Sequence, residues 1–136
     1  MEYIIEDRIP TSEQWMLLRE SVGWSRFPDE AAQRSLDLTP YCVCAFCGDE
    51  LVGMGRVLGD CITIFYVGNV IVRAEFQKQG IGRKIMERLM AFVEKNAIPG
   101  ATASLLSVSG KEDFYEQFGF KRRPDEDDGC GMSRRF

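Results

Sequence analysis

The sequence predicts an α+β fold in which helices pack on one curved, mixed and mostly antiparallel sheet. Three observations predict it. Apolar residues recur at helical spacing between residues 12 and 37, and the pattern then changes to that of strands. Two Gly-Asp turns, at residues 48–49 and 59–60, separate three extended segments as in an antiparallel meander. A long amphipathic helix and a further strand follow, which is typical of a βαβ crossover.

The first forty residues predict a short strand and two helices. Residues 3–6 are expected to form the strand. Thr11 or the serine after it can cap a helix over residues 12–22, which Gly23 ends. A second helix is expected over residues 28–37, because proline and two carboxylates suit a first helical turn.

The middle of the chain predicts three antiparallel strands. They are expected at residues 41–47, 51–58 and 61–72. The third segment is long for a strand and contains Gly68-Asn69 in its middle. A glycine at such a place often marks a bulge or the close approach of another backbone, so we expect the third strand to be bulged there.

The last third predicts a helix, a strand, a short helix and a hairpin. The clearest helix has an apolar stripe at helical spacing, formed by Ile81, Ile85, Leu89, Phe92 and Val93. Residues 101–108 are expected to form a strand. Ser109 and Glu112 have the spacing of a capping box and predict the start of a short helix. Residues 120–123 and 132–136 are expected to pair as a final hairpin. The sheet would thus be flanked by about four helices.

Length and composition exclude several classes of protein. A chain of 136 residues without repeats or linkers predicts one domain spanning residues 1–136. The formal net charge of −4 disfavours binding to nucleic acid or to an anionic membrane. We see no secretion signal or membrane-spanning segment, and therefore expect a soluble, cytoplasmic protein. The absence of histidine excludes every mechanism that needs an imidazole.

The five cysteines are expected to be reduced. Cys42, Cys44 and Cys47 lie in an apolar strand, where free thiols behave as small hydrophobic groups. The alternative is that this cluster binds a metal ion or takes part in redox chemistry, although no histidine is present to complete a mixed Cys/His metal site. We expect no metal cofactor.

The most informative segment is a glycine loop between a strand and the long helix. Gly80-Ile81-Gly82 opens that helix, where the first backbone N–H groups have no intrahelical partner and the helix dipole is positive. Lys78, Arg83 and Lys84 add positive charge. This pattern favours a diphosphate ligand, although glycines that only allow close packing are the alternative. The sequence patterns of nucleotide and dinucleotide loops are both missing.

Two motifs resemble those of the GNAT (GCN5-related N-acetyltransferase) superfamily, in particular its small single-domain bacterial members. The family's pyrophosphate loop, R/Q-x-x-G-x-G/A, is matched by Gln77-Lys78-Gln79-Gly80-Ile81-Gly82. The family's tyrosine lies in an aromatic-Tyr-x-x-x-Gly-Phe context, matched by residues 114–120. The order of elements also agrees with the family's acyl-CoA N-acyltransferase fold. The resemblance therefore covers nearly the whole chain.

The resemblance implies acyl transfer from acetyl-CoA to an amine, with acetyl-CoA as co-substrate. Tyr115 would be the catalytic residue, protonating the leaving thiolate or donating a hydrogen bond to it. The strand would bind the acetyl group and pantetheine arm through its main chain, and the loop would bind the pyrophosphate. The residues implied in binding are Val70, Ile71, Val72, Gln77, Lys78, Gln79, Gly80, Ile81, Gly82 and Arg83. Lys78 stands where the family's loop often has glycine.

The sequence identifies neither the acceptor amine nor the general base that would deprotonate it. Asn69 occupies a place where relatives often have an acid, so water, a backbone carbonyl, Glu20 or Asp29 are the remaining candidates for the base. Trp24 and Phe27 would line the acceptor pocket or simply pack. A small-molecule amine is favoured over a protein or peptide amine. A non-catalytic acyl-CoA-binding or regulatory domain is the alternative, and a homodimer through sheet edges or the terminal hairpin is expected.

Overall fold

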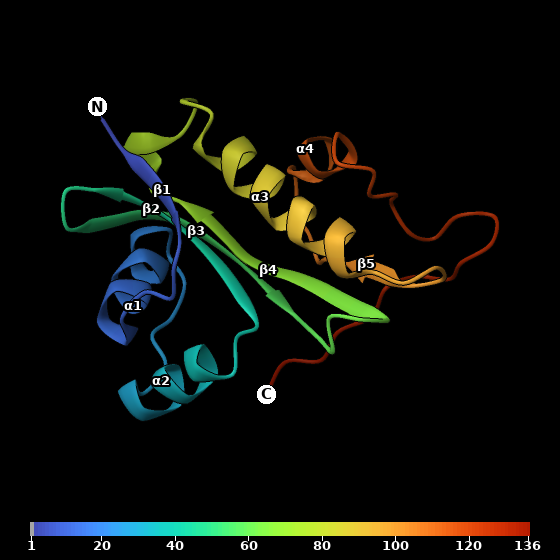
Figure 1. Cartoon of the computed structure of the whole chain (residues 1–136), viewed down its shortest axis with the longest axis horizontal. Helices are drawn as coiled ribbons and strands as arrows, with labels where there is room; N and C mark the ends of the chain where they lie inside the picture. Colours follow the sequence, from blue (N-terminus) through green and yellow to red (C-terminus); the bar gives the residue numbers. More distant parts are fainter. Residues whose placement is uncertain (1) are drawn as a thin grey trace.

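One five-stranded mixed sheet forms the centre of the protein (Figure 1). The computed structural model describes residues 2–136. The strands follow one another across the sheet in chain order: β1 (Ile4–Asp7), β2 (Tyr41–Cys47), β3 (Glu50–Leu58), β4 (Ile64–Val72) and β5 (Thr102–Ser104). The first three pairings are antiparallel, and only β4 and β5 run parallel. The expected mixed, mostly antiparallel sheet is confirmed.

Helices cover both faces of the sheet. α1 (Ser12–Ser21) and α2 (Asp29–Asp37) lie on one face, and α3 (Ile81–Asn96) lies on the other with the short α4 (Glu112–Glu116) (Figure 1). A single 3-10 turn, Ala74–Phe76, connects β4 to the glycine loop. α1 begins with a capping box, in which the backbone N–H of Gln14 donates to Thr11 Oγ1 and the backbone N–H of Thr11 donates to Gln14 Oε1.

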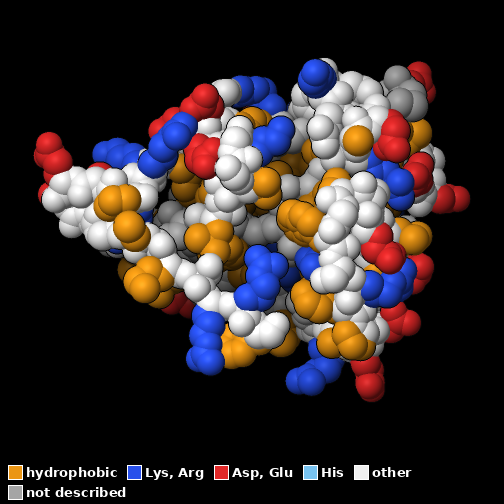
Figure 2. Space-filling view, turned by 180° about the vertical axis from the view of Figure 1, so that it is seen from behind, with side chains coloured by type: hydrophobic (Ala, Val, Ile, Leu, Met, Phe, Trp, Pro, Cys, Tyr) orange, Lys and Arg blue, Asp and Glu red, His pale blue; other side chains and the backbone are white. Residues whose placement is uncertain are grey.

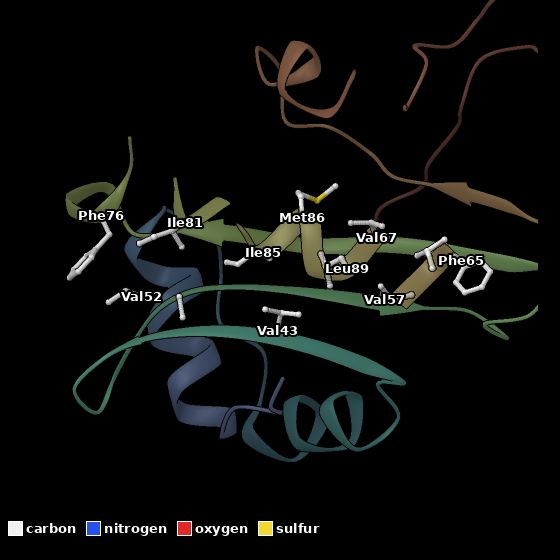
Figure 3. Close-up of a cluster of buried hydrophobic side chains, with 12 residues drawn as sticks. Val43, Val52, Val57, Phe65, Val67, Phe76, Ile81, Ile85, Met86 and Leu89 are labelled. Carbon is white, nitrogen blue, oxygen red and sulfur yellow. The ribbon is translucent and has the colours of Figure 1, made fainter. Parts of the chain in front are cut away.

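Alternate residues along the strands point to opposite faces of the sheet and pack into two separate hydrophobic cores. The core under α3 contains Val43, Val52, Val57, Phe65 and Val67 from the strands and Ile81, Ile85, Met86 and Leu89 from the helix (Figure 3). The core under α1 and α2 contains Trp15, Met16, Leu18, Leu36, Cys42, Cys44, Phe46, Met54 and Ile71. Each fully buried side chain of this kind contributes about 1.5–3 kcal/mol.

Gly55 allows α3 to approach the sheet closely. A Cβ atom at this position would lie 2.7 Å from Leu89 Cδ1 and 2.9 Å from Ile85 Cγ2. Any larger residue would therefore push the helix outward or force both side chains from their places. Gly55 thus sets the distance between α3 and the sheet, and with it the position of the loop from which the helix starts.

The cysteines of β2 are core residues, as expected. Cys42 and Cys44 are both buried on the α1 face, with their Sγ atoms 4.0 Å apart. The contact with Cys42 and burial raise the pKa of the Cys44 thiol. All five cysteines are free, Cys130 being exposed in the tail. Within residues 2–136, no group of three or more Cys, Asp or Glu side chains is placed to hold a metal ion.

The C-terminal region differs from the expected strand, capped helix and hairpin. β5 covers only Thr102–Ser104, because the chain then diverges from β4. The predicted capping box is wrong: α4 starts after Lys111, and Glu112 accepts a hydrogen bond from the backbone N–H of Gly110 instead. The predicted hairpin is also wrong. Residues 120–136 of the described chain form no strand: only Phe120 is half-buried against the core, and residues 121–136 are exposed, with no apolar surface against which to pair.

The turn after β3 delays the start of β4, which begins at Ile64 and not at residue 61. The Asp60 carboxylate accepts hydrogen bonds from the backbone N–H groups of Ile62, Thr63 and Ile64 at 2.8–3.0 Å, and from Thr63 Oγ1 at 2.6 Å. These donors, the Thr63 hydroxyl first, hold the pKa of Asp60 well below its usual value.

We predict that Asp60→Asn destabilises the protein more at neutral pH than in acid. Because the folded pKa lies below the unfolded value of about 3.9, the carboxylate stabilises the fold above that pH, and the contribution is lost as pH falls through the folded pKa. Urea unfolding at pH 7, 4 and 2.5 measures the effect, with the tail variant Glu126→Gln as control. A difference from wild type that is equal at pH 7 and 2.5 would contradict this account.

None of the described helices is both long and apolar enough to span a membrane.

Candidate active site

A bulge in β4 shapes the centre of the candidate site. β3 and β4 pair Arg56 with Gly68 and Met54 with Ile71, so that β4 has one residue more than β3 between these pairs. Asn69 lies in this bulge with φ of +53°. The bulge expected at Gly68-Asn69 is confirmed.

The bulge sets which main-chain groups face the free side of β4. The backbone N–H of Arg73 donates to Val52 O of β3 at 2.8 Å, so by alternation the main chains of Val72 and Val70 point away from β3. The main chain of Ile71 points to β3, and its side chain is buried under α1. Val70 and Val72 are therefore the two predicted strand residues that present their backbone to the other edge.

That edge opens because β4 and β5 diverge. Their pairing extends only from Ile64 and Thr102 to Tyr66 and Ser104. Beyond Tyr66, β4 has no strand partner on this side among residues 2–136. The opening leaves backbone hydrogen-bonding groups of β4 available to an extended ligand, as the edge of a sheet does for an added strand.

The glycine loop lies at the end of this opening. Gly80, with φ of +84°, is the N-cap of α3, and Lys78 has φ of +65°. The first helical hydrogen bond at this end joins Lys84 N–H to Gly80 O at 3.1 Å. The N–H groups of Ile81, Gly82 and Arg83 precede it and have no carbonyl partner within the helix.

Side chains from the loop hold it to the strand and to the N-terminal segment. Gln77 Nε2 donates to Val72 O at 2.9 Å, which fixes the loop against the end of β4. Tyr3 Oη donates to the Gln79 carbonyl at 3.3 Å. Lys84 Nζ donates to Tyr3 Oη at 2.9 Å, so this expected loop charge is engaged by the N-terminal segment.

The two sequence motifs meet at the start of α3. A Cβ atom at Gly82 would lie 3.6 Å from Phe114 Cζ, so α4 packs on the first turn of the helix. Arg83 hydrogen-bonds the side chain of Gln117, and its guanidinium lies 5.4 Å from the centre of the Phe118 ring. The tyrosine motif and the loop motif therefore belong to one site, with Arg83 between them.

Tyr115 faces a cavity of about 550 Å³ beside the bulge. Residues of α1, α2, β3, β4 and segment 105–108 complete its wall. The Tyr115 ring packs edge-on against Phe114, with ring centres 5.1 Å apart. Burial, and to a smaller extent the neighbouring Tyr66, raises the pKa of Tyr115 above its ordinary value. Its hydroxyl is therefore protonated at neutral pH and can act as a donor.

The expected acceptor-pocket residues also line this cavity. Trp24 and Phe27 lie on its wall, together with Tyr66, which sequence reasoning missed. Gly68 makes room for that tyrosine, because a Cβ atom there would lie 3.1 Å from Tyr66 Cε2. The cavity thus has an aromatic wall next to the opening between β4 and β5.

Arg56 is the main residue that the sequence analysis missed. It is only 7% exposed and lines the cavity. Its Nε donates to Asn69 Oδ1 at 2.8 Å, and its Nη1 donates to Ser35 Oγ at 3.0 Å and Thr39 Oγ1 at 3.1 Å. Arg56 is the one charged residue of the segment 51–58, and a lone charge in an apolar strand was the available signal.

Neither candidate carboxylate base lies at the cavity. Arg26 pairs with Glu20 at 2.9 Å and with Asp29 at 3.6 Å, and both acids are outside the lining. Asn69 is held by Arg56 and carries no acidic group. Of the described residues that line the cavity, none is Asp or Glu.

Comparison with known proteins decides the family. A family model described as an acetyltransferase (GNAT) domain matches residues 17–132. The chain belongs to the GNAT acetyltransferase family. The fold described above is thus that of a GNAT protein, as the resemblance implied.

Solved structures support the same GNAT assignment. A Staphylococcus aureus protein of unknown function, described as a probable acetyltransferase, is 32% identical, with a TM-score of 0.90 over 99% of this chain and 100% of that one. A GNAT family acetyltransferase of Streptococcus pneumoniae is 24% identical, with a TM-score of 0.80 over 99% of this chain and 98% of that one. At this identity the second likeness shows the fold alone.

A curated relative is similar over part of the GNAT domain. GCN5-related N-acetyltransferase 2, chloroplastic, of Arabidopsis thaliana is 32% identical over 76 residues, which are 56% of this chain and 29% of that protein. The match thus spans less than a third of the relative's length.

Proposed function

We propose that this protein is an acetyl-CoA-dependent N-acetyltransferase that transfers an acetyl group directly to the primary amine of a small molecule. One observation carries the proposal: the opening between β4 and β5 connects the glycine loop at one end with the cavity of Tyr115 at the other. Free main-chain groups and a helix N-terminus line the route between them.

The residues present fit acetyl-CoA. The N–H groups of Ile81, Gly82 and Arg83 would bind the pyrophosphate, aided by the positive end of the α3 dipole. Gly80 and Gly82 carry no side chain to hold a phosphate away. The N–H groups of Val70 and Val72 would bind the arm that lies in the opening. When bound, acetyl-CoA supplies the thioester carbonyl that an amine attacks.

Tyr115 would assist the departure of the thiolate. As the C–N bond forms and the C–S bond breaks, negative charge develops on sulfur, and the Tyr115 hydroxyl donates a hydrogen bond to it. The raised pKa of Tyr115 keeps the hydroxyl protonated throughout the neutral range. No enzyme nucleophile takes part, so the absence of histidine is no obstacle.

The acceptor amine must lose its proton before it attacks. The cavity contains two arginines, Arg19 and Arg56, and no carboxylate among its described lining residues. The proton therefore passes to water or to a backbone carbonyl, which are the candidates for the base that the cavity lining still allows.

A cavity of about 550 Å³ with aromatic walls is in the usual range for small-ligand sites. This favours a small amine over a protein or peptide amine. A non-catalytic acyl-CoA-binding domain is the competing proposal. Tyr115, half-buried at the cavity with its hydroxyl free of hydrogen bonds to residues 2–136, favours catalysis.

The test measures binding and turnover separately. We expect acetyl-CoA at saturating concentration to raise the melting temperature by several degrees, as ligands that bind only the folded state do. We expect release of free CoA, detected with a thiol reagent, when primary amines are added as a panel. Binding without turnover on any amine would support the non-catalytic domain, and failure to bind would exclude both functions.

Cytoplasmic localisation and a homodimer stay predictions. With no terminal hairpin, the dimer would use a sheet edge, and light scattering coupled to size-exclusion chromatography measures its mass.

A further inference from the structure

Two arginines at the cavity have no acidic partner. Among the described residues, Arg56 hydrogen-bonds only neutral groups, and Arg19 donates through Nε to the Ser25 carbonyl at 2.8 Å. Neither takes part in any ion pair of residues 2–136, whereas six other arginines do: Arg8, Arg26, Arg73, Arg88, Arg122 and Arg123. Buried charges are normally paired, so a buried arginine with only neutral partners needs explanation.

Both guanidinium groups retain unused donors. A guanidinium has five N–H groups, and Arg56 uses Nε and Nη1, which leaves Nη2 without a partner among residues 2–136. Arg19 uses Nε alone. The Arg56 guanidinium lies 4.6 Å from the centre of the Trp15 ring, and that of Arg19 lies 4.4 Å from the centre of the Phe27 ring. Aromatic rings therefore fix both groups in place.

The two positive charges act on each other. Burial lowers the pKa of both arginines, and at Arg56 the nearby charge of Arg19 adds to this lowering. An anion bound between them would relieve the repulsion and the missing hydrogen bonds together. The cavity supplies no such anion from its own described lining. Viewed from behind, the molecule has a hollow bordered by hydrophobic and basic side chains, with most acidic side chains toward the outer edges (Figure 2).

We propose that the acceptor carries an anionic group, a carboxylate or a phosphate, which Arg19 and Arg56 bind while its amine faces the opening between β4 and β5. This inference rests on the proposed function and names its substrate class. The planar fork of arginine suits both kinds of anion. The aromatic wall of Trp24, Phe27 and Tyr66 favours an apolar body between the two ends.

Matched pairs of acceptors test the substrate class. 4-(Aminomethyl)benzoate and benzylamine differ in a carboxylate that lies across an apolar ring from the amine, and O-phosphoethanolamine and ethanolamine differ in the phosphate. We expect kcat/KM to be at least about tenfold higher for the anionic member of one pair, and which pair responds distinguishes the two anions. Equal or better rates with the neutral members of both pairs would overturn the inference while leaving the acetyltransferase proposal standing.

Variants test the residues. Arg19→Gln should raise KM for the anionic acceptor about ten- to a hundredfold, the range for a lost hydrogen bond to a charged group, and change KM for its neutral partner much less. Arg34→Gln, on the exposed part of α2, is the control. Arg56→Gln should act in the same direction, and if it fails to fold, Arg19→Gln decides the question. An equal change for both members of a pair would contradict anion recognition.

Direct binding measurements test the anion site without requiring acetyl transfer. Titration of the acetyl-CoA-saturated protein with 3-phenylpropanoate, its neutral amide and inorganic phosphate needs no transfer of the acetyl group. We expect the carboxylate or the phosphate to bind, the amide to bind at least about tenfold more weakly than the carboxylate, and Arg19→Gln to abolish the preference. If no amine is acetylated but this preference is found, the proposed function fails and the anion site stands. Absence of any preference overturns the anion site.

Discussion

Gly82→Asp should raise the dissociation constant for acetyl-CoA about a hundredfold or more without weakening the fold. The substitution places a carboxylate on the first turn of α3, where the pyrophosphate is proposed to bind. Two like charges about 4 Å apart repel by roughly 4 kcal/mol near a protein surface, and solvent screening reduces this. Isothermal titration calorimetry with acetyl-CoA measures the loss.

The fold should tolerate the change for a specific reason. A Cβ atom at Gly82 would lie 3.6 Å from Phe114 Cζ and 3.9 Å from Val72 Cγ2, which are ordinary contacts. An acidic residue in the first turn also interacts favourably with the helix dipole, by about 0.3–1 kcal/mol. We therefore expect the melting temperature of the unliganded variant to equal or exceed that of wild type.

Two controls separate charge from shape. Gly82→Ala adds the same Cβ atom without the charge and should weaken binding much less than Gly82→Asp. Gly129→Asp adds the same charge in the exposed tail, where nothing lies within 4 Å of a Cβ atom, and should bind like wild type. If Gly82→Asp binds acetyl-CoA within threefold of wild type, the loop is not the pyrophosphate site.

Local signals predicted the loop and the helices. Gly80 adopts a left-handed conformation at the N-cap of α3, which is where glycine has a conformational advantage. Lys78 is also left-handed, with φ of +65°, a conformation that glycine adopts more readily than other residues. Such features depend on a few neighbouring residues, so the sequence alone could reveal them.

Long-range packing decided what the sequence did not predict. Leu105, Leu106 and Val108 are as apolar as a strand, but they line the cavity and do not pair with β4. The Ser109 and Glu112 spacing is correct for a cap, yet the left-handed Gly110 turns its N–H to Glu112. The first outcome depends on neighbours distant in sequence, and the second depends on the backbone conformation of Gly110, which the residue spacing does not specify.

The same holds for the cavity of the candidate site. Arg56 meets Ser35, Thr39 and Asn69 only because α2, β3 and the β4 bulge converge. The sequence identified Asn69 as a missing acid, whereas the structure shows it as an acceptor for a buried arginine. No carboxylate of the described cavity lining can remove the amine's proton, which leaves water or a backbone carbonyl as the base.

Tyr115→Phe should lower kcat about a hundredfold and leave acetyl-CoA binding unchanged. The magnitude follows from comparing two acids. An alkyl thiol has a pKa of about 8.5, and the pKa of Tyr115 is raised above 10, so full proton transfer to the thiolate is unfavourable. Tyr115 therefore acts mainly as a hydrogen-bond donor to the developing charge, and such bonds contribute about 1.5–3 kcal/mol, at the lower end of acid catalysis.

The pH profile of this variant distinguishes the donor role from packing. Because the Tyr115 pKa is raised, its protonated form persists through pH 9, and the deficit of the phenylalanine variant should be constant from pH 7 to 9. The aromatic contacts with Phe114 are retained, so the melting temperature should not fall.

Tyr41→Phe, which removes a hydroxyl from a ring stacked on Phe92 outside the cavity, is the matched control and should keep wild-type kcat. A Tyr115→Phe enzyme with more than half of wild-type kcat would show that the hydroxyl does not act on the leaving group, and Tyr66→Phe would then test the second cavity tyrosine for that role.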